Sequence, residues 1–136
     1  MIRNVVLGRL RQAEDPAQRE ADAAQLQQGL AAIAALSFPG LVAMSAGTDL
    51  GLRDGGWSFA IVNDWQDADA YRAYDADQEH NRIRREIIVP ICQDIARVQF
   101  ELDRHGEQGL SHRSRSTVQA GSVLGPHSSS EPNATE

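Results

Sequence analysis

The sequence predicts a small α+β domain with a ferredoxin-like β-α-β-β-α-β subunit plan over residues 1–102. Four stretches alternate between apolar and polar residues, which is typical of half-buried strands. Helical patterns separate the first strand from the second and the third from the fourth. From residue 103 this periodicity stops, and too few apolar side chains remain to offset the entropy cost of ordering. Residues 103–136 are therefore expected to form a disordered C-terminal tail.

The first half of the domain is predicted to be strand, helix and strand. Side chains alternate between two faces in residues 2–10. Asp15 and Pro16 then supply a helix cap and a proline for the first helical turn. Apolar residues recur at helical spacing through residues 17–36, which predicts a helix with one apolar face. A Phe-Pro-Gly turn leads from this helix into a second strand at residues 41–48.

The second half adds a strand, two short helices and a closing strand. Residues 57–65 show the clearest alternation in the chain. Asp67 can cap a short helix, and a second helix is expected from about residue 78 to 89, where Pro90 ends it. The closing strand alternates over residues 95–102. Four antiparallel strands with helices on one face leave the other face open. A homodimer is therefore expected, because a second copy packed sheet to sheet would cover that face.

Composition narrows the class of partner. The formal net charge is −6, so neither nucleic acid nor a membrane surface is expected as a partner, because both attract basic patches. No stretch approaches the roughly 20 apolar residues that span a bilayer, and the first residues do not read as a signal peptide. A cytoplasmic location is the expectation. Cys92 is the single cysteine, and no Cys/His spacing predicts a metal site.

Several short strings, taken in their order along the chain, match a known family. They are Met1-Ile2-Arg3-x-Val5-Val6-Leu7, Phe38-Pro39-Gly40-Leu41, Gly47-x-Asp49-Leu50, Phe59-Ala60-Ile61-Val62-x-Asp64-Trp65, Ala70-x-x-x-Tyr74 with His80 six residues on, and Phe100-Glu101. With this order and spacing, residues 1–102 resemble the stress-responsive A/B barrel (Dabb) domain family. The resemblance implies a dimeric α+β barrel with a pocket between the sheet and the helices of each subunit.

The resemblance also implies a chemistry that needs no cofactor. The plant olivetolic acid cyclase, a member of this family, closes a linear polyketide thioester by aldol condensation with a tyrosine and a histidine six residues apart. Tyr74 and His80 have this spacing. Histidine suits a general base because its unperturbed pKa is about 6.5, and a tyrosine hydroxyl in a dry pocket can stabilise an oxyanion. The expected function is a small cyclase- or isomerase-like protein for a polyketide-like or carbonyl substrate.

The candidate site has a third member, Asn4, and departs from the family pattern at two places. The family often has histidine at the position of Asn4, which keeps a hydrogen-bonding side chain but cannot titrate. Asp77 and Gln78 stand where the family usually has His-Pro. Asn63 and Asp64 are expected at a sheet edge or in solvent. The substrate-binding walls are expected to be apolar, with a glycine that leaves room for substrate: Val6, Gly8, Leu30, Ile33, Ile61 and Ile91.

Two other functions remain open. Tyr74 and His80 can equally be structural residues at a helix end, in which case the protein is a non-catalytic, stress-related dimer that binds an apolar ligand. The other reading is a cofactor-free monooxygenase with the same barrel plan. One charged run is expected to be a solvated helix face or, alternatively, to meet an anionic group such as a coenzyme A phosphate. Its members are Arg82, Arg84, Arg85 and Glu86.

Overall fold

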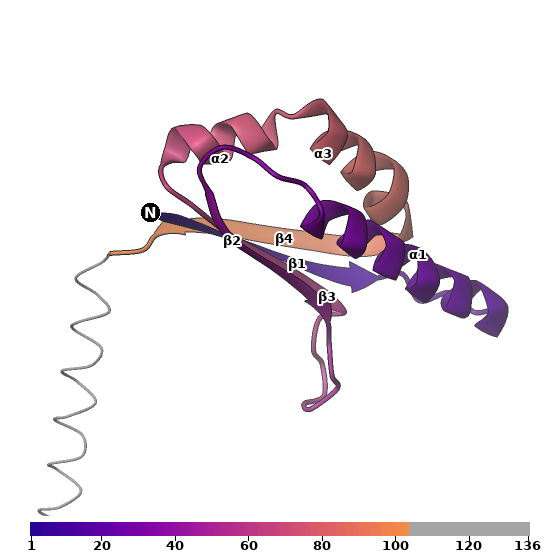
Figure 1. The fold of residues 1–136 in the computed structure, drawn as a ribbon. Helices are drawn as coiled ribbons and strands as arrows, with labels where there is room; N and C mark the ends of the chain where they lie inside the picture. The colour runs from indigo at the N-terminus through magenta and orange to yellow at the C-terminus, as the bar shows by residue number, and fades with distance from the viewer. Residues whose placement is uncertain (104–136) are drawn as a thin grey trace, which may run out of the picture. The chain divides into compact units, whose positions relative to one another are not determined.

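A four-stranded antiparallel sheet with helices on one face forms the framework of the protein (Figure 1). The computed structural model describes residues 1–103. The strand order is β2-β3-β1-β4, so that β1 (Ile2–Leu10) and β3 (Phe59–Trp65) are central. The edge strands are β2 (Leu41–Thr48) and β4 (Cys92–Glu101). The predicted ferredoxin-like α+β fold is thereby confirmed.

Met1–Leu102 form one compact unit. The tail predicted for residues 103–136 lies, from residue 104 onward, outside the described residues.

Three helices cover one face of the sheet (Figure 1). They are α1 (Pro16–Ala34), α2 (Ala68–Asp75) and α3 (Gln78–Ile83). Each begins after an aspartate whose carboxylate accepts a hydrogen bond from a backbone amide of the first turn. Two of these caps, Asp15 and Asp67, are the ones that the sequence predicts, and they set where the helices begin.

The helix predicted from about residue 78 to 89 is interrupted. After α3 the chain passes through a π-helical turn, η1 (Arg84–Ile88), and a 3-10 turn, η2 (Val89–Ile91). Pro90 has no amide hydrogen and its ring clashes with the preceding turn of a regular helix, so the α-helical pattern ends before it. β4 then begins at Cys92, earlier than the predicted residue 95. Single π turns often occur at functional sites, and this one lines the cavity described below.

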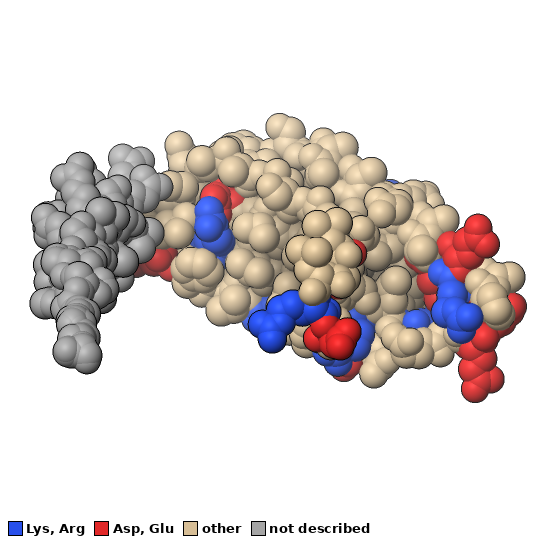
Figure 2. Space-filling view, turned by 90° about the horizontal axis from the view of Figure 1, so that it is seen from below, with Lys and Arg blue, Asp and Glu red and all other residues tan. Residues whose placement is uncertain are grey.

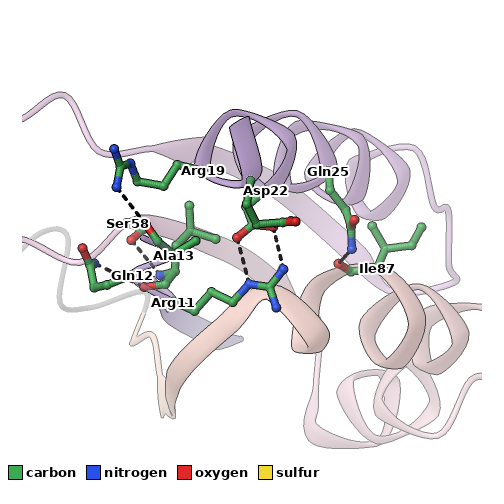
Figure 3. A network of polar contacts seen from close by, with 10 residues as sticks. Arg11, Gln12, Ala13, Arg19, Asp22, Gln25, Ser58 and Ile87 are labelled. Carbon is green, nitrogen blue, oxygen red and sulfur yellow. Dashed lines mark hydrogen bonds and ion pairs between the residues drawn. The ribbon is translucent and has the colours of Figure 1, made fainter. Parts of the chain in front are cut away.

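An ion pair between a buried aspartate and an exposed arginine fixes α1 against the end of β1 (Figure 3). Arg11 donates to both carboxylate oxygens of Asp22 at 2.9 Å, and Gln18 adds a bond at 2.8 Å. These bonds, led by the one from Arg11, lower the pKa of Asp22 below its ordinary value. Nearby, Gln25 donates to the Ile87 carbonyl at 2.8 Å and so satisfies a backbone acceptor of the π turn. Polar side chains of α1 thus bind both Arg11, at the end of β1, and the backbone of η1.

The apolar core lies between the sheet and the helices. Its buried members come from α1, β3 and the α3–η2 segment: Leu26, Leu30, Ile33, Phe59, Ile61, Ile83, Ile88 and Ile91. Gly8 on β1 pairs with Phe59 on β3, and a Cβ atom added to Gly8 would lie 2.0 Å from Cζ of the Phe59 ring. The space above Gly8 is therefore filled by a protein side chain, and the expected room for substrate is absent there.

Replacing Gly8 with alanine should lower the free energy of unfolding by about 1–3 kcal/mol, because the added methyl group overpacks the Phe59 ring. Urea denaturation measures the loss. Gly47→Ala is the matched control, since nothing lies within 4 Å of a Cβ atom at that strand position. The Phe59→Leu change should recover part of the loss in the Gly8→Ala background. Equal stabilities for the two alanine variants would contradict this packing.

The face of the sheet turned away from the helices carries an apolar patch, and Figure 2 shows mostly uncharged side chains on this side. The strand register places six small or aliphatic residues in two adjacent rows across β3, β1 and β4. This open-face patch consists of Val5, Leu7, Ala60, Val62, Ala96 and Val98. The ion pairs Arg3–Asp64 (2.7 Å) and Arg9–Asp94 (3.5 Å) lie on either side of the patch along the strands.

Candidate active site

A cavity of about 240 Å³ lies between the sheet and the segment from α2 to η1. Six of the nine predicted site residues line it: Asn4, Val6, Ile33, Ile61, Tyr74 and His80. The other three do not. Leu30 and Ile91 belong to the packed core, and Gly8 lies under the Phe59 ring. The structure therefore brings the three predicted polar residues together. Of the six predicted wall residues, it places only Val6, Ile33 and Ile61 at the cavity.

His80 and Tyr74 face each other at this cavity. Their ring centroids lie 4.0 Å apart with an angle of 33° between the ring planes. The exposed fractions are 7 % for His80 and 3 % for Tyr74. Asp77 caps α3 and accepts a hydrogen bond from the backbone amide of His80 at 2.9 Å. The residue at which the sequence departs from the family pattern thus fixes the backbone of the candidate base.

The surroundings of His80 favour a neutral imidazole. Burial lowers the pKa of His80 below 6.5, and the charge of Arg84 lowers it further, against smaller opposing effects of Asp75 and Asp77. The backbone of Tyr74 also favours a proton on the ring, but the contact falls short of a well-formed hydrogen bond. Within residues 1–103, Nδ1 of His80 is buried without a hydrogen-bond partner. Such groups are rare in folded proteins, and a catalytic role is one recognised explanation for them.

The Tyr74 hydroxyl stays protonated at neutral pH. Burial raises the pKa of Tyr74 to about 12, although a hydrogen bond with the Asn63 side chain acts in the opposite direction. Oδ1 of Asn63 already accepts from Nε1 of Trp65 at 2.6 Å and from Nδ2 of Asn4 at 3.1 Å. Nδ2 of Asn63 donates to Sδ of Met44 at 3.6 Å, which leaves its second N–H for Tyr74, so that the phenolic proton can donate to a ligand.

The prediction that Asn63 and Asp64 lie at an edge or in solvent is wrong. Both belong to the central strand β3, and their exposed fractions are 0 % and 7 %. Asp64 pairs with Arg3 on the open face. The signal for Asn63 is present in the sequence, because alternation over residues 57–65 places it on the same face as Ile61 and Trp65. A polar residue on an apolar strand face indicates a buried hydrogen-bond network.

Asn4, the third predicted catalytic residue, lines the cavity from β1 on its sheet side. Its exposed fraction is 3 %. Its Nδ2 donates to Asn63, and its Oδ1 accepts from Nε2 of Gln99 at 2.8 Å. Both ends of the amide are engaged, so Asn4 orients Asn63 and, through it, Tyr74. Gln99 was not among the predicted site residues, because its contact with Asn4 depends on the register of β4 against β1.

The chain belongs to the family described as Stress responsive A/B Barrel Domain (Dabb), whose model matches residues 2–102. Among solved structures, a dimeric ferredoxin-like protein of unknown function from Thermobifida fusca is 36 % identical, with a TM-score of 0.57. That match covers 74 % of this chain and 90 % of the other. No curated protein matched the sequence.

Two further structures share the fold alone. A hydroxynitrile lyase from Passiflora edulis is 20 % identical over 76 % of this chain and 94 % of the other, with a TM-score of 0.53. An antibiotic biosynthesis monooxygenase is 16 % identical over 76 % of this chain and 99 % of the other, with a TM-score of 0.55. The fold therefore occurs in proteins named for different activities. Over residues 1–103, no helix has the length and apolar content needed to cross a membrane.

Proposed function

We propose that this protein is a cofactor-free general-base catalyst that acts on a polyketide-like or other carbonyl substrate, with cyclase- or isomerase-like chemistry. One observation carries the proposal. A buried imidazole whose pKa is lowered lies against a buried phenol whose pKa is raised, at the wall of a partly apolar cavity. Acid–base catalysis at neutral pH requires one group that is free to accept a proton and a second group that stays protonated and can donate a hydrogen bond.

The proposed reaction begins with a C–H bond next to a carbonyl group. His80 takes the proton, the C–H electron pair forms the C=C bond of an enolate, and the charge moves to the carbonyl oxygen. The Tyr74 hydroxyl donates a hydrogen bond to that oxygen. In an aldol closure the enolate carbon then attacks a second carbonyl of the same molecule, and the protonated His80 returns its proton to the new alkoxide. In an isomerisation the proton returns to a different carbon. Neither route, as written, requires an oxidant or a metal ion.

Proton exchange in D2O tests this function without knowledge of the natural substrate. The wild-type protein should speed exchange of the α-protons of phenylacetone, a ketone with slow background exchange, as followed by proton NMR. Gln78→Ala, at an exposed position of α3, serves as the control and should behave as wild type. An unchanged exchange rate in the His80→Gln variant would contradict the proposal. Saturable binding of the ketone without exchange would favour the ligand-binding dimer instead.

We propose in addition that two copies pack through the open-face patch. The 36 % identical Thermobifida fusca protein is described as dimeric. In this chain the patch is apolar, and the charges beside it are paired within the subunit. Burying the patch therefore leaves none of these charges without a partner: Arg3, Asp64, Arg9 and Asp94. An apolar sheet face of this kind is typical of a symmetric interface.

Val98→Asp should convert the dimer to a monomer, because it places an unpaired carboxylate within an apolar interface. Size-exclusion chromatography with light scattering measures the mass. Val89→Asp is the matched control, since Val89 is also an exposed valine but lies in η2, away from the sheet face. A dimer that survives Val98→Asp at micromolar concentration would contradict packing through this patch.

A further inference from the structure

Two arginine side chains at the cavity form no ion pair with any residue in the part of the chain that the structure describes. Arg84 lies half-buried in η1, and Arg97 lies on β4 opposite Val6. Within residues 1–103 neither forms an ion pair, although the Asp75 carboxylate also belongs to the cavity wall. Arg84 makes one long contact, 3.4 Å from Nε to Oδ1 of Asn81. The arginines that do form ion pairs are Arg3, Arg9, Arg11, Arg72 and Arg82.

The charges of these two arginines affect the pKa values of side chains around the cavity. Burial is the main cause that lowers the pKa of His80, and the charge of Arg84 is the second. The pKa of Tyr71 is raised by burial and by Asp75, and the charge of Arg97 acts against that rise. Two guanidinium groups and one carboxylate give the cavity wall a net positive charge, on a chain whose formal net charge is −6. The local positive charge of the cavity wall attracts a small anion, whereas the negative net charge of the chain opposes its approach, so an anion that binds there is held by the two arginines themselves.

We propose that the cavity binds a small monocarboxylic acid, with its carboxylate held by Arg84 and Arg97 and its apolar part against Val6, Ile33 and Ile61. This inference rests on the proposed function and names its substrate class, a carbonyl compound that also carries a carboxylate. Arginine suits this role because its planar guanidinium donates two parallel hydrogen bonds to a carboxylate.

Cavity size and charge favour a carboxylate over a phosphate. The volume of about 240 Å³ is below the roughly 300–1,000 Å³ of sites for drug-sized ligands. A phenyl ring or a short branched chain fits such a space, whereas the body of a coenzyme A thioester would have to remain outside. Asp75 lies in the same wall and repels a dianionic phosphate more strongly than a singly charged carboxylate.

A comparison of phenylacetate with phenylacetamide tests the inference, because the two probes differ mainly in charge. Isothermal titration calorimetry gives the affinities, and the NMR shifts of the His80 ring report whether the probe enters the cavity. Phenylacetate should bind the wild type at least tenfold more tightly than phenylacetamide. Arg84→Gln and Arg97→Gln should each remove most of this preference. Arg85→Gln is the matched control and should retain it, because Arg85 is exposed, outside the cavity wall, and bonded to the Asn81 carbonyl.

The other outcomes distinguish a failure of this inference from a failure of the proposed function. Equal affinities for acid and amide, or no binding of either, would show that the cavity holds no carboxylate site. Loss of the preference in Arg85→Gln to the same extent would show a general surface field instead of a site. Displacement of phenylacetate by equimolar inorganic phosphate would assign the arginines to a phosphate group. If phenylacetate binds as expected while ketone exchange does not depend on His80, the proposed catalysis fails and the carboxylate site stands.

Discussion

Replacing His80 with glutamine should slow α-proton exchange in the ketone probe by about 10²- to 10⁴-fold, the contribution that a positioned general base makes. Glutamine keeps a polar side chain of similar reach but cannot accept a proton at neutral pH. The fold should persist, because the Asp77 cap of α3 bonds to the backbone amide at position 80 and not to the imidazole. NMR exchange rates for both proteins at the same concentration measure the effect.

A companion variant, Tyr74→Phe, tests the second member of the pair, with Gln78→Ala again as the control. It keeps the aromatic ring against His80 but removes the donor to the developing oxyanion, a change that costs about 10²–10³ in rate at other oxyanion sites. A reduced rate in both variants, with unchanged thermal unfolding, supports a catalytic pair. A reduced rate in Tyr74→Phe with full activity in His80→Gln would assign the base to another residue.

Replacing Trp65 with alanine should lower the free energy of unfolding by about 3–5 kcal/mol, the usual cost of removing a buried tryptophan. Trp65 has an exposed fraction of 0 % and packs against the rings of Phe38 and Tyr74. Its Nε1 also donates to Oδ1 of Asn63, so its loss leaves that buried acceptor with one donor fewer. Urea denaturation followed by circular dichroism measures the change.

The second tryptophan of the chain provides a matched control for this stability prediction. Trp57 is only partly buried, and Arg9 stacks on its ring at 4.3 Å. Trp57→Ala should therefore cost clearly less than Trp65→Ala. Equal losses in the two variants would mean that the aromatic cluster around Tyr74 contributes no special stability, and that Asn63 and Tyr74 are held by other contacts.

Much of the fold could be predicted because its signals are local. The alternation over residues 2–10 and 57–65 corresponds to the central strands, and two of the aspartates before the helices are caps that the sequence predicts. The departure after α3 comes from Pro90, which marks where a helix must end but not that a π turn precedes it. The Dabb domain resemblance over residues 1–102 is confirmed by the family match over residues 2–102.

The candidate site could be predicted only in part, because its contacts depend on strand register. Sequence spacing and the family resemblance indicated the pair Tyr74 and His80, which the structure brings together. Gly8 was interpreted as space for substrate, but β1 and β3 pair so that Phe59 lies opposite it. Arg97 reaches the cavity for a similar reason, since β4 sets it beside Val6. No local pattern in the sequence encodes which residues face each other across two strands.

The protonation state of His80 tests the central claim of a neutral base in this cavity most directly. A pH titration of the His80 ring by NMR, with its signals assigned from the His80→Gln variant, gives the pKa of the imidazole. The structure predicts a pKa below 6.5, because burial and the charge of Arg84 both oppose the protonated form. The rate of α-proton exchange should then be constant above that pKa and fall below it. A pKa at or above 6.5 would mean that the imidazole is not held neutral by its surroundings, and would contradict the account.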